Sequence, residues 1–246
     1  MPQSLTPHAV TLIISGILLN CSNLPADDIG WISLFNGEDL SGWSVQCLPE
    51  DRGKTYWSVQ EGTIQCDSMN DPDHDYVWLQ FDREFEDFEL KLKFRSLENS
   101  RGNSGVQFRS RYDDGTDAPG GGWLDGPQAD INPRGPFRNG LIYDETRSEK
   151  RWINPSLPDS RISPEAVPGE FVYHEGDWND MFIRCLGTRI VVVVNGIQIT
   201  NFNAKGILDD KAHQELNVGM NGYIALQLHR NDALKIQFKD LFLREL

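Results

Sequence analysis

The segment Phe88-Glu89-Leu90-Lys91-Leu92-Lys93-Phe94-Arg95 alternates strictly between apolar and charged side chains. Successive side chains of a β-strand point to opposite faces, so the apolar residues share one face and the charged residues share the other. This is the pattern of a strand with one buried face and one solvated face. The segment therefore predicts a sheet that covers a hydrophobic core.

Shorter strand-like runs extend from this segment in both directions. Asn195-Gly196 lies between two β-rich runs and is the strongest short-range signal for a hairpin. In the last run the apolar phase changes between Phe238 and Leu241, which predicts a bulge near Asp240. Outside the first residues, no stretch with helical periodicity exceeds two turns. Many short strands separated by turns predict an all-β sandwich of two packed antiparallel sheets, spanning about residues 32–246.

Composition excludes several classes of protein. The chain has 246 residues, which is long enough to bury a hydrophobic core. Its net charge is −14, and the resulting negative field repels phosphate backbones. Nucleic acid is therefore not an expected partner. The four cysteines have no zinc-binding spacing. A Cys47–Cys66 disulfide and free thiols remain alternatives, and free thiols are favoured.

Residues 1–25 have the features of an export leader. The apolar run 9–19 suits the core of a signal peptide and is too short to span a bilayer. Cys21 follows in the manner of a bacterial lipoprotein, although the leader lacks Lys and Arg and Asn20 occupies the place of a small residue. A buried or disordered leader is the alternative interpretation. We expect export to the periplasm or cell surface, with membrane attachment only through a lipid on Cys21.

Four pairs of polar residues interrupt the strand-like runs, each pair spaced by two. Side chains two apart in a strand point the same way, and a core does not tolerate so many unpaired polar groups. A solvated cleft that binds a polar ligand does, and carbohydrate is the first candidate. The pairs are Gln107–Arg109, Gln128–Asp130, Tyr143–Glu145 and Gln227–His229.

Five groups of segments, followed by two closing ones, resemble a known family in their order and spacing. They are 34–37 with 40–43, 102–109, 128–131, 141–145 with Arg147, 177–179 leading to 195–196, then 224–229 and 238–241. Together they resemble the 3-keto-disaccharide hydrolase domain family over about residues 31–246. Pro127 departs from the Tyr common at that position. The resemblance implies a concanavalin A-like jelly roll with a carbohydrate cleft on its concave sheet, and action on glycosides already oxidised to a ketone at C3.

Asp130, Glu145 and His229 are the predicted catalytic acids and bases. A ketone at C3 acidifies the C2 hydrogen, so a base can form an enolate and the C1 aglycone can leave by elimination, with water adding afterwards. Asp130 and Glu145 could instead form an ordinary glycosidase pair, or merely cap turns or pair with arginines. His229 has the alternative of a structural histidine at the sheet edge.

The remaining site residues are predicted to bind substrate. Arg109 and Arg147 would orient a sugar oxygen or neutralise the carboxylates, and Tyr143 would donate to an oxyanion. Trp123 and Trp152, in predicted loops, would stack on sugar, whereas Trp31, Trp43, Trp57 and Trp178 are expected in the core. Gln107, Gln128 and Gln227 complete the set. No cofactor is required, a divalent metal that polarises the ketone is an option, and a non-catalytic carbohydrate-binding (lectin-like) module is the alternative function.

Overall fold

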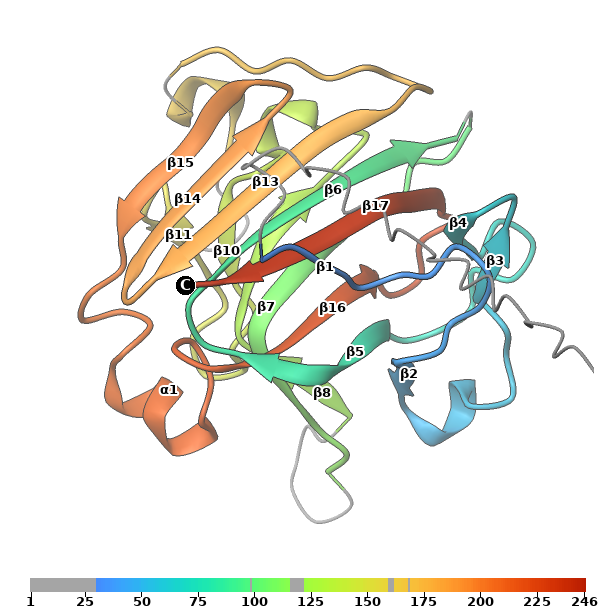
Figure 1. Ribbon diagram of the computed structural model, residues 1–246, viewed down its shortest axis with the longest axis horizontal. Helices are drawn as coiled ribbons and strands as arrows, with labels where there is room; N and C mark the ends of the chain where they lie inside the picture. Colours follow the sequence, from blue (N-terminus) through green and yellow to red (C-terminus); the bar gives the residue numbers. More distant parts are fainter. Residues whose placement is uncertain (1–29, 98, 116–121, 159–161, 168) are drawn as a thin grey trace, which may run out of the picture.

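The computed structural model describes residues 30–97, 99–115, 122–158, 162–167 and 169–246 (Figure 1). The predicted leader and Cys21 lie outside these residues. The alternating segment forms β6 (Phe88–Ser96), and its four apolar side chains are buried as predicted. This strand lies in the middle of the first sheet, sheet A, which thereby turns one face to the core.

Sheet A is antiparallel throughout its described strands. Its order is β15-β14-β13-β6-β17-β4-β3, and β1 pairs with β17. The strands besides β6 are β1 (Ile32–Ser33), β3 (Trp57–Gln60), β4 (Thr63–Asp67), β13 (Asn179–Leu186), β14 (Arg189–Val194), β15 (Ile197–Asn203) and β17 (Lys235–Glu245).

Sheet B forms the second layer and is also antiparallel (Figure 1). Its order is β12-β11-β10-β9-β7-β16-β5-β2, and β8 pairs with β7. The strands are β2 (Trp43–Cys47), β5 (Val77–Phe85), β7 (Ser104–Asp113), β8 (Trp123–Asp125), β9 (Pro127–Ile131), β10 (Ile142–Asp144), β11 (Arg151–Asn154), β12 (Leu157–Pro158) and β16 (Gly222–Leu228).

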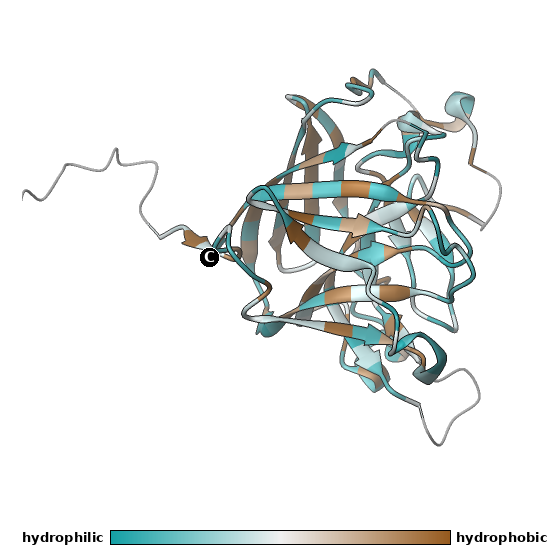
Figure 2. Ribbon diagram, turned by 90° about the vertical axis from the view of Figure 1, so that its right-hand side faces the viewer, coloured by the Kyte–Doolittle hydropathy of each residue, from teal (hydrophilic) through white to brown (hydrophobic). Residues whose placement is uncertain are grey.

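The core lies between the two sheets. Phe94 and Phe238 of sheet A and Phe108 and Leu226 of sheet B belong to one cluster of fully buried side chains. Along the strands, hydrophobic and hydrophilic residues alternate (Figure 2). Burial of each such large apolar side chain stabilises the fold by about 2 kcal/mol. The predicted all-β sandwich of two packed sheets is confirmed.

Both predicted local features of the sheets are present. Asn195 and Gly196 have φ values of 49° and 80° between β14 and β15, as a primed hairpin turn requires. The register of β17 against β6 shifts between Lys239 and Phe242, and Asp240 has a φ of 54°. The bulge therefore lies where the apolar phase changes.

Helices are short in the described part of the chain. They are η2 (Pro49–Asp51), η3 (Pro136–Arg138), η4 (Pro164–Ala166) and α1 (Lys211–Leu216). None of these described helices is long and apolar enough to cross a membrane. Cys47, Cys66 and Cys185 are buried free thiols, so the alternative disulfide is not formed.

The core assignment of the four tryptophans is only half correct. Trp43 and Trp57 are buried in the main core. Trp31 and Trp178 are partly exposed, and basic side chains of sheet A cover part of their rings. Lys91 Nζ is 4.3 Å from the centre of the Trp31 ring, and Lys239 Nζ is 4.2 Å from that of Trp178.

Candidate functional site

A polar cavity of about 390 Å³ opens on the face of sheet B that is turned away from the core. Seven of the eleven predicted site residues line this cavity. They lie on or directly after strands β8, β9, β10, β11 and β16. These seven are Asp130, Glu145, His229, Gln128, Tyr143, Trp123 and Trp152.

Strand alternation explains why these side chains meet. In β9, Ala129 and Ile131 enter the core, so Gln128 and Asp130 point to the cavity. In β10, Ile142 enters the core and Tyr143 points outward, directly opposite Gln128 in the antiparallel register. Both side chains of the predicted pairs Gln128–Asp130 and Tyr143–Glu145 thus line the cavity.

Gln128 and Asp130 present hydrogen-bond acceptors that no described residue satisfies. Asn103 Nδ2 donates to Asp130 Oδ1 over 2.9 Å, but Asp130 Oδ2 and Gln128 Oε1 have no partner in the described chain. A buried unsatisfied polar atom costs about 1–3 kcal/mol. Hydroxyl groups of a bound ligand would supply the missing donors. Burial also raises the pKa of Asp130 to about 6.

Glu145 is the second buried carboxylate of the cavity. Burial raises its pKa to about 7, opposed by a 3.2 Å hydrogen bond from Gln227 Nε2 to Oε1 and by the charge of His229. Its main chain is held by Trp123, whose Nε1 donates to the Glu145 carbonyl over 2.6 Å. Near neutral pH both cavity carboxylates can therefore exchange a proton, as acid–base catalysis requires.

His229 forms a hydrogen-bonded chain with two residues that sequence reasoning missed. Its Nε2 lies 2.9 Å from the Tyr76 hydroxyl, and its Nδ1 lies 3.3 Å from Asp232 Oδ2. Burial lowers the pKa of His229, but the hydrogen bond and charge of Asp232, with the charge of Glu145, outweigh it and raise the pKa overall. The spacing of three residues between His229 and Asp232 is the feature of the sequence that could have indicated Asp232. Tyr76 lies 153 residues away in the chain and left none.

The two predicted stacking tryptophans line the cavity from strands, not from loops. Trp152 in β11 is only 5% exposed and packs edge-on against Tyr143 with ring centres 5.1 Å apart. Trp123 in β8 is half-buried, and Lys150 Nζ lies 4.0 Å from the centre of its ring. Trp152 is thus not the open platform predicted for stacking.

Arg109 does not reach the cavity, contrary to expectation. Its guanidinium is fully buried and donates to the carbonyls of Glu86, Gly187 and Gly219, and it pairs with Asp87 at 2.8 Å. The register of β7 against β16 shifts here, and Arg109 has a φ of 49°. This bulge breaks the alternation that would have placed Arg109 beside Gln107.

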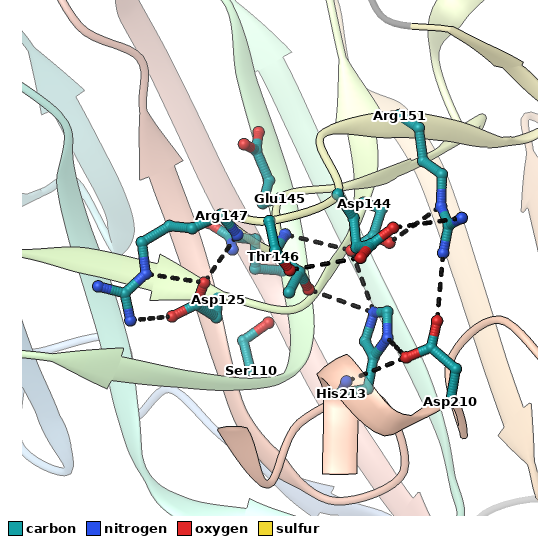
Figure 3. Close-up of polar contacts among 12 residues, drawn as sticks. Ser110, Asp125, Asp144, Glu145, Thr146, Arg147, Arg151, Asp210 and His213 are labelled. Carbon is teal, nitrogen blue, oxygen red and sulfur yellow. Dashed lines mark hydrogen bonds and ion pairs between the residues drawn. The ribbon is translucent and has the colours of Figure 1, made fainter. Parts of the chain in front are cut away.

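Arg147, Gln107 and Gln227 also lie outside the cavity lining. Arg147 pairs with Asp125 and Asp113 at 2.8 Å each, while Glu145 points away from this ion pair (Figure 3). Gln107 is buried, and its Nε2 donates to the Leu124 carbonyl over 2.9 Å. Gln227 is buried and reaches the site only through Glu145.

A second buried ion-pair cluster lies beside Glu145 (Figure 3). His213 of α1 lies between Asp144 and Asp210, at 3.2 Å and 2.7 Å from their oxygens. Asp144 Oδ1 also accepts the Thr146 N–H over 3.1 Å. Both neighbours of Glu145 in the chain are thereby fixed, which holds its backbone for the cavity.

No metal-binding group is assembled within the described ranges. Nowhere among those residues do three or more His, Cys, Asp or Glu side chains gather in a way that could hold an ion. Three cationic side chains line the cavity, namely Arg134, Arg138 and Lys150.

Comparisons with known proteins agree with this fold. The family described as 3-keto-alpha-glucoside-1,2-lyase-like domain matches residues 30–244. A 3-keto-disaccharide hydrolase of Bacteroides thetaiotaomicron is 29% identical over 102 residues, which cover 38% of this chain and 34% of that protein. The matched segment thus spans about a third of that relative.

Solved structures share the fold at low identity. A putative glycosyl hydrolase of Parabacteroides distasonis superposes with a TM-score of 0.58 at 16% identity, covering 88% of this chain and 94% of the other. The carbohydrate-binding module CBM66 of Bacillus subtilis superposes with a TM-score of 0.52 at 11% identity, covering 83% and 96%. The jelly-roll architecture is therefore shared by a protein named as a putative glycosyl hydrolase and by a carbohydrate-binding module.

Proposed function

The chain belongs to the 3-keto-alpha-glucoside-1,2-lyase-like domain family, and on this premise we propose that it cleaves the glycosidic bond of sugars that carry a ketone at C3. The observation that carries the proposal is the pair of buried carboxylates, Asp130 and Glu145, with pKa values near 6 and 7 beside the Tyr76–His229–Asp232 chain. A binding module does not need carboxylates whose pKa values lie close to 7, whereas an enzyme that transfers protons at neutral pH does.

The proposed first step is removal of the C2 proton. The C3 ketone acidifies this hydrogen, and ionised Glu145 accepts it to leave an enolate. Lys150 and Arg138 line the same cavity and supply positive charge for the enolate oxygen. Asp130 and Gln128 accept hydrogen bonds from sugar hydroxyls through their unsatisfied oxygens and so orient the ring.

Departure of the aglycone then requires a proton. With His229 protonated, both ring nitrogens donate, one toward Asp232 and the other toward the Tyr76 oxygen. The Tyr76 hydroxyl hydrogen can then point into the cavity. As the C1–O bond breaks, Tyr76 protonates the leaving oxygen and His229 reprotonates Tyr76.

Addition of water to the unsaturated sugar completes hydrolysis. The water oxygen bonds to C1, its proton returns to His229 through Tyr76, and C2 recovers a proton from Glu145. The net reaction consumes one water and restores every protein group to its starting state.

Matched substrates test this proposal. A nitrophenyl glucoside and its 3-keto form are compared for nitrophenol release, using wild-type protein, Glu145→Gln and the surface control Glu38→Gln. We expect release from the keto form only, a loss of at least about 100-fold in Glu145→Gln, and solvent deuterium at C2 during back-reaction. Equal release from both glucosides would indicate an ordinary glycosidase. Release from neither, with measurable sugar binding, would indicate a lectin-like module.

A further inference from the structure

A second and larger cavity adjoins the first. Its volume is about 720 Å³, and Arg134 lines both cavities, so they meet at this side chain. Its walls come from residues 96–97 and 99–101, from Pro133 and Arg134, and from the segment 173–176. The acid–base groups described above do not line it.

Two exposed arginines on this wall, Arg101 and Arg134, form no short ion pair with a carboxylate of the described residues, although the charge of Arg134 helps to lower the pKa of Asp232 from beyond ion-pair distance. No hydrogen bond or ion pair joins the side chain of Arg101 or Arg134 to any residue in the described ranges. The chain carries 37 acidic and only 23 basic residues, so carboxylates are abundant. Most described arginines outside the cavities, such as Arg111 and Arg147, are paired. Glu175, on the same wall, is not within ion-pair distance of either cavity arginine.

The other groups of the wall are hydrogen-bonding rather than aromatic. The Tyr173 hydroxyl is buried, which raises its pKa, and a hydrogen bond with Ser96 opposes this effect. Ser96, Asn99 and Ser100 add polar groups, and neither Trp nor Phe lines this cavity. The wall therefore suits a hydroxylated ligand better than a flat aromatic one.

We propose that this cavity binds the leaving group of the substrate, and that this group is a sugar acid whose carboxylate pairs with Arg134 and Arg101. The proposal rests on the function proposed above, since it places the bond to be broken at the junction of the two cavities. The planar guanidinium matches a carboxylate in bidentate geometry, and a carboxylate placed there would give both arginines a short ion pair that no described residue provides. A sulfate ester offers similar charge with tetrahedral geometry.

Binding of uncleaved ligands tests the charge preference without turnover. Titration calorimetry compares a glucosyl-glucuronic acid disaccharide, its neutral glucuronamide and a glucosyl-glucose 6-sulfate, all unoxidised. We expect the carboxylate to bind about tenfold more tightly than the amide and the sulfate. Arg134→Gln and Arg101→Gln should each reduce the carboxylate-to-amide ratio several-fold, and Arg52→Gln, at an exposed arginine outside both cavities, should leave it unchanged.

Measurements of turnover then test the anionic leaving group and the proposed keto-glycoside activity separately. The 3-keto forms of the acid and amide disaccharides are compared by kcat/KM in the same variants. Cleavage of both with equal kcat/KM, together with equal binding, would overturn the anionic leaving group and leave the keto-glycoside activity standing. Preferred binding of the acid without cleavage of either would support the cavity assignment and overturn the proposed activity. Preference for the sulfate would replace the sugar acid by a sulfated sugar and overturn the inference.

Discussion

Gln227 in β16 donates a hydrogen bond from Nε2 to Oε1 of Glu145, 3.2 Å away, although β7 and β9 separate their strands in sheet B. The bond favours the ionised carboxylate and opposes the effect of burial, which raises the pKa of Glu145 to about 7. A residue outside the cavity lining thus sets the pH at which the proposed base becomes active.

Replacement of Gln227 by Met should move the pH profile. A hydrogen bond to a charged group is worth about 1.5 kcal/mol, and one pKa unit corresponds to about 1.4 kcal/mol. The acid limb of kcat/KM on a keto-glycoside should therefore move up by about one pH unit. Gln237→Met, at a buried glutamine bonded to Gln65 in sheet A, is the matched control. An unmoved limb in folded Gln227→Met would argue against Glu145 as the base.

Glu145→Gln should stabilise the protein at alkaline pH while removing activity. The folded pKa lies above the usual 4.5, so wild-type stability falls as pH rises from about 4.5 to about 7 and stays low above that window. The variant carries no charge and should exceed the wild type by about 2–3 kcal/mol at pH 8, with little difference at pH 4. Urea unfolding at both pH values measures this. Glu38→Gln, an exposed position, should change stability equally at both.

Asp232→Asn should retain the geometry of the histidine chain and change its charge. An Asn oxygen can still accept the Asn103 N–H, which now donates to Asp232 over 2.7 Å. Because Asp232 raises the pKa of His229, the NMR titration midpoint of His229 should fall. We expect kcat to fall roughly 100-fold, since less His229 is protonated to support Tyr76. Asp240→Asn, at the exposed bulge, should leave both the midpoint and kcat unchanged.

His213→Asn should change the response of stability to pH. Burial lowers the pKa of His213, but the hydrogen bonds and charges of Asp144 and Asp210 raise it overall. The stabilisation is therefore complete below the unfolded pKa of about 6.5 and is lost as pH rises through the folded value. The variant should be about 3 kcal/mol less stable at pH 6, as expected when a buried pair is broken, with a smaller deficit at pH 9. A deficit of equal size at both pH values would mean that His213 is neutral in the fold.

Arg109→Lys should damage stability rather than substrate binding. One ammonium group cannot replace a planar guanidinium that reaches three carbonyls and Asp87, so we expect a loss of about 3 kcal/mol. The KM of the protein that remains folded should not change. Arg111→Lys, at a partly exposed pair with Glu84, should cost less than about 1 kcal/mol. A raised KM with unchanged stability in Arg109→Lys would restore the original assignment.

The fold and much of the site could be predicted from local periodicity. Gln128 and Asp130 point to the cavity because β9 keeps its two-residue period from end to end. Arg109 escaped prediction because a single residue with positive φ changes the phase of β7, and an Arg gives no signal of that conformation.

Pairings across the fold could not be predicted. Tyr76 meets His229 only because β5 and β16 are neighbours in sheet B, a relationship that strand patterns alone do not specify. The raised pKa values of Asp130 and Glu145 could not be predicted from the sequence either, because they depend on burial by strands that are distant in the chain.

The acid–base groups and the cavity arginines lie on different kinds of structural element. Asp130 and Glu145 are fixed by strand register and by anchored neighbours, so substitutions around them should seldom be tolerated. Arg134 lies between β9 and η3, and Arg101 lies in the β6–β7 connection, outside the regular strands of either sheet. Such connections accept exchange more readily than strands. Under the proposed function, grafting these two connections between relatives should therefore change which glycosides are cleaved while the acid–base groups stay in place, which would make the scaffold suited to directed evolution.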